Sequence, residues 1–239
     1  MRWIRLAALL GTALLTACAA PGLTGPQAVD GALQGHITDG VYHDRRHWFS
    51  VGVPFGPQDP EYGDVRLREE YPRNVTLVSF LALHNPGEYY YAYIEDFTAG
   101  GHPIPGLGAL ADSAIRVFGR ELMETRVEPL QLVKEEPWTT AHTQGLIRMY
   151  HEQVPSELLM QNLGMAEDYT AYILMYVTVQ TGKVVMLWVE WPSGCSVCTP
   201  VTPGAPTASQ DPIARALAQD ARAQTFLDSF QYTPEAGTP

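Results

Sequence analysis

The chain of 239 residues carries 15 Lys and Arg residues against 26 Asp and Glu residues, a formal net charge of −11 at pH 7. Its length is enough for one large domain with a substantial core or for two small domains, and we expect one. Binding to nucleic acid depends on basic residues that neutralise phosphates. The acidic balance therefore argues against a nucleic-acid-binding protein.

Residues 1–17 have the pattern of a signal peptide. Arg2 and Arg5 form a basic start, and a nearly unbroken apolar run follows from Leu6 to Leu15. This run is about half the length of the ~20 residues that cross a bilayer as a helix, so we do not expect a transmembrane anchor. Removal of the segment leaves 13 basic and 26 acidic residues, which changes the net charge from −11 to −13.

The apolar run ends in Leu15-Thr16-Ala17-Cys18. This sequence resembles the bacterial lipobox, with leucine at −3, a small residue at −1 and cysteine at +1. In lipoproteins the thiol of the matching cysteine, here Cys18, receives diacylglycerol, and its amine is usually acylated after cleavage. Two or three acyl chains, at about 0.8 kcal/mol per buried methylene, would hold the protein at a membrane almost irreversibly. The alternative is an ordinary secreted protein with a cysteine near the cleavage site.

The lipobox resemblance also implies a location in the cell envelope. In Gram-negative lipoproteins an aspartate after the cysteine marks retention in the inner membrane, whereas position 19 here is alanine. We therefore expect an outer-membrane protein that faces the periplasm. Anionic headgroups repel an acidic domain, so the lipid alone is expected to hold it. The expected partner is another envelope protein.

Composition divides the mature chain into a tether and a domain. Residues 18–35 are rich in Pro, Gly and Ala, and we expect them to form the lipidated N-terminus and a flexible tether. A single α+β domain is expected over residues 36–232, followed by a disordered tail over residues 233–239.

Most of the expected domain has the residue pattern of β-strands. Strands are predicted at 37–42, 48–54, 75–84, 89–97, 126–136, 143–154, 169–180 and 183–191. The turn sequences Asn85-Pro86-Gly87 and Thr181-Gly182 predict β-hairpins between the strands that flank them. The second hairpin is long, which favours a central place in an antiparallel sheet.

Two segments have the spacing of helices. Apolar residues recur every three to four positions over residues 108–125, which predicts a helix with one buried face. A closing helix is predicted from Asp211, which can cap it, with Pro212 in the first turn. Its predicted apolar side includes Ile213, Leu217 and Ala221.

Three short features resemble the Mog1/PsbP-like fold. They are the aromatic strand Trp48–Pro54 that ends in proline, the Gly182-Lys183 hairpin, and the closing Leu227-Asp228-Ser229-Phe230. The resemblance implies an antiparallel β-sheet covered by helices in an α/β/α sandwich. Its members are mostly non-catalytic binding or assembly modules, and no catalytic motif can be carried over from them. An α+β lipoprotein of another family is the alternative.

Cys195 and Cys198 follow an apolar strand, as the Cys-x-x-Cys motif of a thioredoxin does. In a thioredoxin the first cysteine directly follows a tryptophan and begins a helix, whose N-terminal amides lower the thiol pKa. Here Pro192-Ser193-Gly194 separate Trp191 from Cys195. In an oxidising periplasm we expect a local disulfide between Cys195 and Cys198. Redox or metal chemistry at the two thiols is the alternative.

The sequence contains no recognised motif for hydrolysis, phosphate binding or metal binding. Gly-x-Ser-x-Gly, His-Glu-x-x-His and a phosphate-binding Gly-rich loop ending in Lys-Ser/Thr are missing. His43, Asp44 and His47 are close in sequence, but without the context of a zinc motif a solvated turn is the preferred interpretation. We therefore predict no catalytic residue, no cofactor and no metal site.

Tyr89, Tyr91 and Tyr93 are candidate binding residues. Side chains alternate along a strand, so these three share one face while residues 90, 92 and 94 share the other. If helices leave this face partly open, its rings can bind sugar, peptide or a partner protein. The alternative is that the rings pack under a helix with their hydroxyls at the rim.

The leading hypothesis is a lipid-anchored, non-catalytic protein that binds or supports another envelope component. Two alternatives of other classes remain open. One is an envelope enzyme, in particular a thiol-redox protein that uses Cys195 and Cys198. The other is a carrier that encloses a hydrophobic ligand.

Overall fold

The computed structural model describes residues 27–28, 34–56, 65–71, 74–82, 88–98, 103–121, 130–154, 169–192 and 211–233. The predicted signal peptide, Cys18, the Asn85-Pro86-Gly87 turn, Cys195 and Cys198 lie outside the described residues. So does the predicted tail, apart from Thr233.

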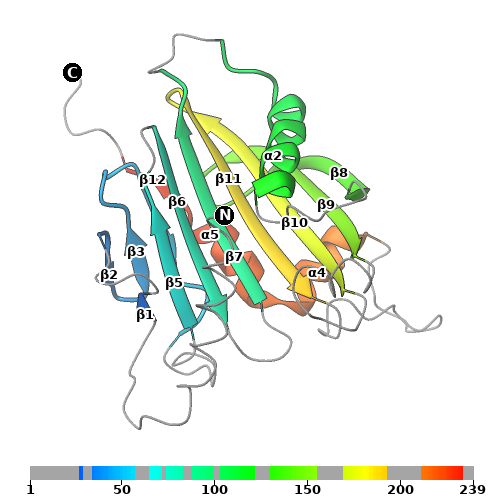
Figure 1. Cartoon of the computed structure of the whole chain (residues 1–239), viewed down its shortest axis with the longest axis horizontal. Helices are drawn as coiled ribbons and strands as arrows, with labels where there is room; N and C mark the ends of the chain where they lie inside the picture. The colour runs from blue at the N-terminus through cyan, green and yellow to red at the C-terminus, as the bar shows by residue number, and fades with distance from the viewer. Residues whose placement is uncertain are drawn as a thin grey trace, which may run out of the picture.

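Eight strands form the main sheet, in the order β1-β5-β6-β7-β11-β10-β9-β8 (Figure 1). Their bounds are β1 Gln27–Ala28, β5 Val65–Glu70, β6 Val75–Ala82, β7 Glu88–Asp96, β8 Gln131–Thr139, β9 Gln144–Val154, β10 Tyr169–Gln180 and β11 Lys183–Pro192. Neighbouring strands are antiparallel except β1 and β5, which are parallel. The prediction of an α+β fold with an antiparallel sheet is confirmed.

The hairpin predicted around Thr181-Gly182 joins the two central strands β10 and β11. Thr181 and Gly182 have φ angles of 49° and 78°, the backbone conformation of a two-residue hairpin turn. The predicted antiparallel pairing of β6 with β7 is also confirmed, since the two strands pair along most of their length. Strand β5 was not predicted. Its Arg66-Leu67-Arg68 segment alternates between charged and apolar residues, and only Leu67 of the three is buried.

A second sheet has the order β12-β4-β3-β2. Its strands are β2 His36–Thr38, β3 Val41–His43, β4 Phe49–Gly52 and β12 Gln231–Tyr232. The prediction of one strand over residues 37–42 is wrong, because Asp39 and Gly40 turn the chain with φ angles of 52° and 76°. Residues 36–43 therefore form a tight hairpin.

The helix predicted over residues 108–125 is confirmed as α2, Leu107–Glu121. Its Leu110, Ala111 and Ala114 are buried, as their spacing predicts. Among the helices of the described residues, none has the length and apolar character needed to cross a membrane.

The single closing helix predicted from Asp211 is instead two helices, α4 Pro212–Gln219 and α5 Ala221–Ser229. Asp211 caps α4 as predicted, because its side chain accepts hydrogen bonds from two backbone N–H groups of the first turn. Asp220 ends α4 and caps α5 in the same way. Because the helix restarts there, Ala221 is exposed rather than buried.

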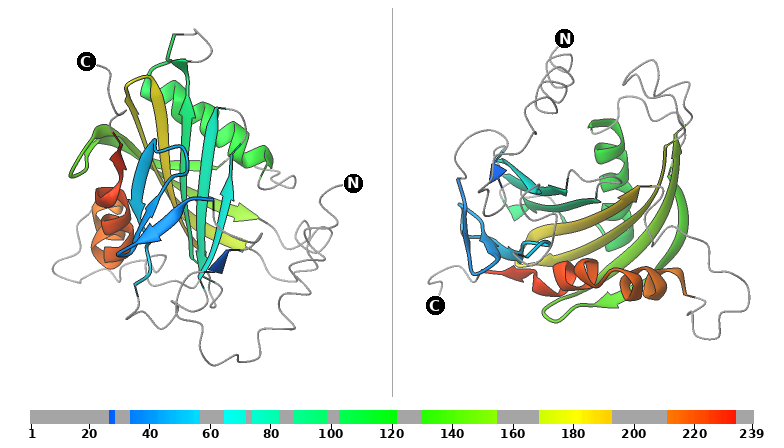
Figure 2. Two further views of the ribbon diagram at one scale, coloured as in Figure 1. Left: turned by 90° about the vertical axis from the view of Figure 1, so that its left-hand side faces the viewer. Right: turned by 90° about the horizontal axis from the view of Figure 1, so that it is seen from below.

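The two faces of the main sheet are covered by different elements (Figure 2). Helices α4 and α5 and the second sheet pack against one face, in a cluster that includes Phe49, Tyr90 and Phe226. Helix α2 packs against the other face, over β9 and β10, in a cluster that includes Leu110 and Trp188. The predicted covering of both faces by helices therefore differs on one face, where the small second sheet contributes as well.

Part of the predicted tether contacts the domain. Gln27 and Ala28 form β1 on the edge of β5, and the backbone N–H groups of Gln34 and Gly35 donate to the Glu69 carboxylate at 2.6 and 2.8 Å. Residue 35 must be small, because a Cβ there would lie 2.5 Å from the carbonyl oxygen of His43. These contacts fasten the segment before β2 to the main sheet at two places.

Candidate functional site

The three tyrosines singled out from the sequence lie on the α2 side of β7. Tyr89, Tyr91 and Tyr93 are partly buried, whereas Tyr90 is fully buried on the opposite side. The predicted division of β7 into two faces is therefore confirmed. Tyr91 and Tyr93 pack at the border of the cluster under α2. We call Tyr89, Tyr91 and Tyr93 the tyrosine face.

Apolar and aromatic residues of the neighbouring strands extend the tyrosine face. Trp188 of β11 lies opposite Tyr91, and Met186 lies opposite Tyr93. On the other side, β6 places Leu77 opposite Tyr93. Directly opposite residues in antiparallel strands have side chains in contact range, so these residues form one surface across three strands.

A cleft of about 60 Å³ lies beside the tyrosine face, between α2 and the sheet. We call it the α2 cleft, and its lining residues are Tyr93, Glu95, Phe97, Leu110, Ser113, Ala114, Val184 and Met186. A cavity that binds benzene has a volume of about 150 Å³. The α2 cleft is therefore large enough for the end of one aliphatic side chain and too small for an aromatic ring.

Glu95 supplies a carboxylate at the rim of the α2 cleft. The Tyr93 hydroxyl donates to Glu95 Oε2 at 2.6 Å, and Asn74 Nδ2 donates to Glu95 Oε1 at 3.3 Å. Within the described part of the chain, Glu95 takes part in no ion pair. Its negative charge is thus stabilised by neutral donors, and a cation can still approach it.

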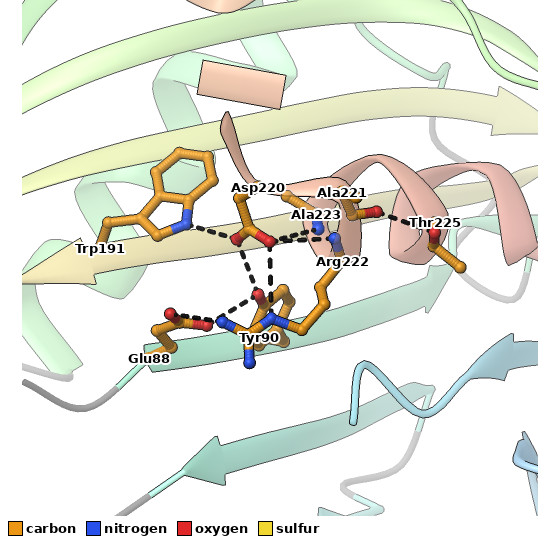
Figure 3. Close-up of polar contacts among 8 residues, drawn as sticks. All are labelled: Glu88, Tyr90, Trp191, Asp220, Ala221, Arg222, Ala223 and Thr225. Carbon is orange, nitrogen blue, oxygen red and sulfur yellow. Dashed lines mark hydrogen bonds and ion pairs between the residues drawn. The ribbon is translucent and has the colours of Figure 1, made fainter. Parts of the chain in front are cut away.

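A second polar cluster lies on the opposite face of the sheet, where β7 begins, β11 ends and α5 begins (Figure 3). Asp220 Oδ2 accepts from Trp191 Nε1 at 2.8 Å and lies 3.0 Å from the Tyr90 hydroxyl. Asp220 Oδ1 accepts from the backbone N–H groups of Arg222 and Ala223. Burial, reinforced by the nearby carboxylates, raises the pKa of Tyr90 well above its ordinary value, so its hydroxyl stays protonated.

The same cluster contains a second carboxylate, Glu88. Its Oε1 accepts from Arg222 Nη2 at 2.8 Å, and its Oε2 lies 3.1 Å from the Tyr90 hydroxyl. Glu88 and Asp220 are both buried. Because donors from the protein already satisfy these carboxylates, the cluster joins α5 to the sheet and is a structural network rather than a ligand site. We call Glu88, Tyr90, Trp191, Asp220 and Arg222 the Asp220 network.

The other sites considered from the sequence have different outcomes. The predicted disulfide between Cys195 and Cys198 lies outside the described residues and stays a prediction. His43 stacks on His36 with ring centroids 4.8 Å apart, and the Asp44 carboxylate accepts from the backbone N–H of Trp48. The described residues hold no group of three or more His, Cys, Asp and Glu side chains that could bind a metal ion.

Several residues of these two clusters were not predicted as site residues. Glu95 was not among the predicted site residues, although its partner Tyr93 lies two positions earlier on the same face of β7. That partner follows from strand alternation, so the sequence contained the signal. Asp220 also had a local signal, since an aspartate within a predicted helix can cap the start of a second helix. No local signal marked Ser113 or Met186, because the two residues come together only through the packing of α2 on the main sheet.

Comparison with known proteins identifies no family. No family model and no curated protein matches the chain. A crystal structure from Bacteroides thetaiotaomicron VPI-5482 matches with 13% sequence identity and a TM-score of 0.33, over 80% of this chain and 47% of that one. The chain thus spans about half the length of that protein. Similarity at this level indicates neither a shared activity nor a shared ligand.

Proposed function

We propose that the protein is a lipid-anchored, non-catalytic binding module of the cell envelope. Lipid on Cys18 holds it to the outer membrane, facing the periplasm, and the domain binds another envelope protein through the tyrosine face. The observation that carries this proposal is the row of partly buried tyrosines beside an apolar cleft. Tyrosine is enriched at protein interfaces because its ring gives apolar contact area and its hydroxyl tolerates water.

The finer proposal for the architecture is a Mog1/PsbP-like α/β/α sandwich. Its support is the placement of α2 on one face of the main sheet and of α4 and α5 on the other. The second sheet is then an addition to that plan. In the family such domains mostly bind or assemble, which agrees with a binding module.

The size of the α2 cleft favours a protein partner over a hydrophobic ligand. A volume of about 60 Å³ suits one side chain, whereas an acyl chain needs a longer cavity. The thiol-redox alternative requires reactive thiols at positions 195 and 198. The proposal assigns these two cysteines to a local disulfide instead.

Lipid anchoring is tested by Cys18→Ser in the full precursor, expressed in a Gram-negative host that is fed radiolabelled palmitate. The variant is expected to lose the label, because serine lacks the thiol that carries diacylglycerol. Cys195→Ser is the matched control and is expected to stay labelled and membrane-bound. Palmitate label on Cys18→Ser equal to that on the unmodified sequence would contradict the anchor.

Binding through the tyrosine face is tested by placing a photo-crosslinking amino acid at Ser113, which is exposed at the rim of the α2 cleft. Illumination of intact cells is expected to join the chain to one envelope protein. Tyr93→Ala should lower the yield about tenfold, because a central aromatic residue commonly contributes more than ~1 kcal/mol to an interface. The control position is Thr225, which is exposed on α5 on the opposite face. The same adducts from both positions, or none from Ser113, would contradict the proposal.

A further inference from the structure

The α2 cleft combines an apolar floor with a polar rim. Leu110, Ala114, Val184 and Met186 are all at least nine-tenths buried and form the floor. Glu95 and Ser113 lie at the rim with the rings of two aromatic residues. A concave apolar site with a few polar groups at its opening selects ligands by shape and by the charge placed next to the apolar part.

The charge at the rim is negative and can still accept a cation. The Glu95 carboxylate accepts hydrogen bonds from two neutral donors, the side chains of Tyr93 and Asn74. It forms no ion pair with the residues that the structure describes. The neighbouring basic residue along the sheet, Lys183, lies opposite Asp96 and points to the other face, where its ammonium lies 5.7 Å from the centre of the Trp48 ring.

Two further features favour a cation at this rim. The rings of Tyr93 and Phe97 border the cleft, and aromatic faces attract ammonium and guanidinium groups. The chain as a whole carries a formal net charge of −11, which increases the rate at which a basic partner associates with it. A cation that reaches the rim therefore meets both a carboxylate and aromatic rings.

We propose that the α2 cleft recognises a polypeptide in which an aliphatic side chain is followed directly by Lys or Arg. The aliphatic side chain fills the cleft, and the cation pairs with Glu95 beside Tyr93 and Phe97. The inference rests on the proposed function, because this polypeptide is a segment of the expected envelope partner. It adds the chemistry that the segment must present.

The test uses the mature chain with Cys18→Ser, labelled with ¹³C at the methionine methyl groups, and two capped tetrapeptides, Ala-Leu-Lys-Ala and Ala-Leu-Glu-Ala. The methyl signal of Met186 is assigned by its loss in Met186→Leu. Ala-Leu-Lys-Ala is expected to shift this signal in a saturable way, with an affinity at least about tenfold higher than that of Ala-Leu-Glu-Ala. Glu95→Gln, which keeps the size of the side chain, is expected to remove the difference.

An unshifted Met186 signal, or equal affinity for the two peptides, would overturn this inference. The other methionine signals report whether Glu95→Gln keeps the native fold. The outcome is separable from that of the proposed function. An adduct from Ser113 in cells together with no peptide response would leave the binding module intact and reject only the recognition chemistry. A peptide response without any adduct would support the recognition chemistry and reject the binding of an envelope protein through the tyrosine face.

Discussion

Replacement of Asp220 by alanine is expected to destabilise the domain by about 3–5 kcal/mol, the range for breaking a buried charged network. The loss of the N-cap of α5 accounts for about 1 kcal/mol of this. The rest arises because the buried indole N–H of Trp191 loses the Asp220 carboxylate and Arg222 loses a nearby negative charge, whereas the Tyr90 hydroxyl keeps Glu88 Oε2 as an acceptor. Urea unfolding followed by tryptophan fluorescence measures the change.

The matched control is Asp211→Ala, which removes the same kind of cap from α4. Asp211 is more exposed than Asp220 and pairs with Lys134, and its contacts with described residues are to that lysine and to two backbone N–H groups. Its loss is expected to cost about 1 kcal/mol. Equal losses for the two variants would mean that the Asp220 network adds nothing to capping. Asp220→Asn keeps an acceptor oxygen for the cap and is expected to lie between the two.

The elements that the sequence predicts well are those whose signals are local. The Thr181-Gly182 turn, the spacing of α2 and the cap at Asp211 each lie within a few residues, so tertiary packing was not needed to find them. Strand β5 was missed because its six residues offer only a short alternation. The Asp39-Gly40 turn is equally local and was overlooked, which turned a hairpin into one predicted strand.

The sites depend on contacts between residues far apart in the sequence. Alternation along β7 predicted which tyrosines share a face, because that property belongs to one strand. The α2 cleft also needs Val184 and Met186 of β11, and the pairing of β7 with β11 joins strands that are not consecutive in the chain. The Asp220 network is more distant still, since Tyr90 and Asp220 are 130 positions apart. Neither site follows from a window of sequence.

Gly145→Ala is expected to destabilise the domain by about 3 kcal/mol or more, because it overpacks the contact between the start of β9 and β10. A Cβ at position 145 of β9 would overlap the backbone carbonyl oxygen of Val177 and would lie 2.8 Å from the Tyr176 ring. The ring is held in place, since its hydroxyl lies 2.9 Å from Thr143 Oγ1. The carbonyl can move only if the pairing of β9 with β10 is disturbed.

Thermal unfolding of Gly145→Ala is expected to begin from the native fold with a Tm lower by about 6–12 °C, at about 2–4 °C per kcal/mol for a domain of this size. Gly106→Ala is the control, since no atom lies within 4 Å of a Cβ there; because Gly106 caps α2 and alanine is a poorer cap, its stability should fall by no more than about 1 kcal/mol. Because the backbone oxygen of Val177 remains in place, Tyr176→Leu should not rescue Gly145→Ala. Rescue by that change would show that the ring, and not the strand pairing, requires glycine at position 145.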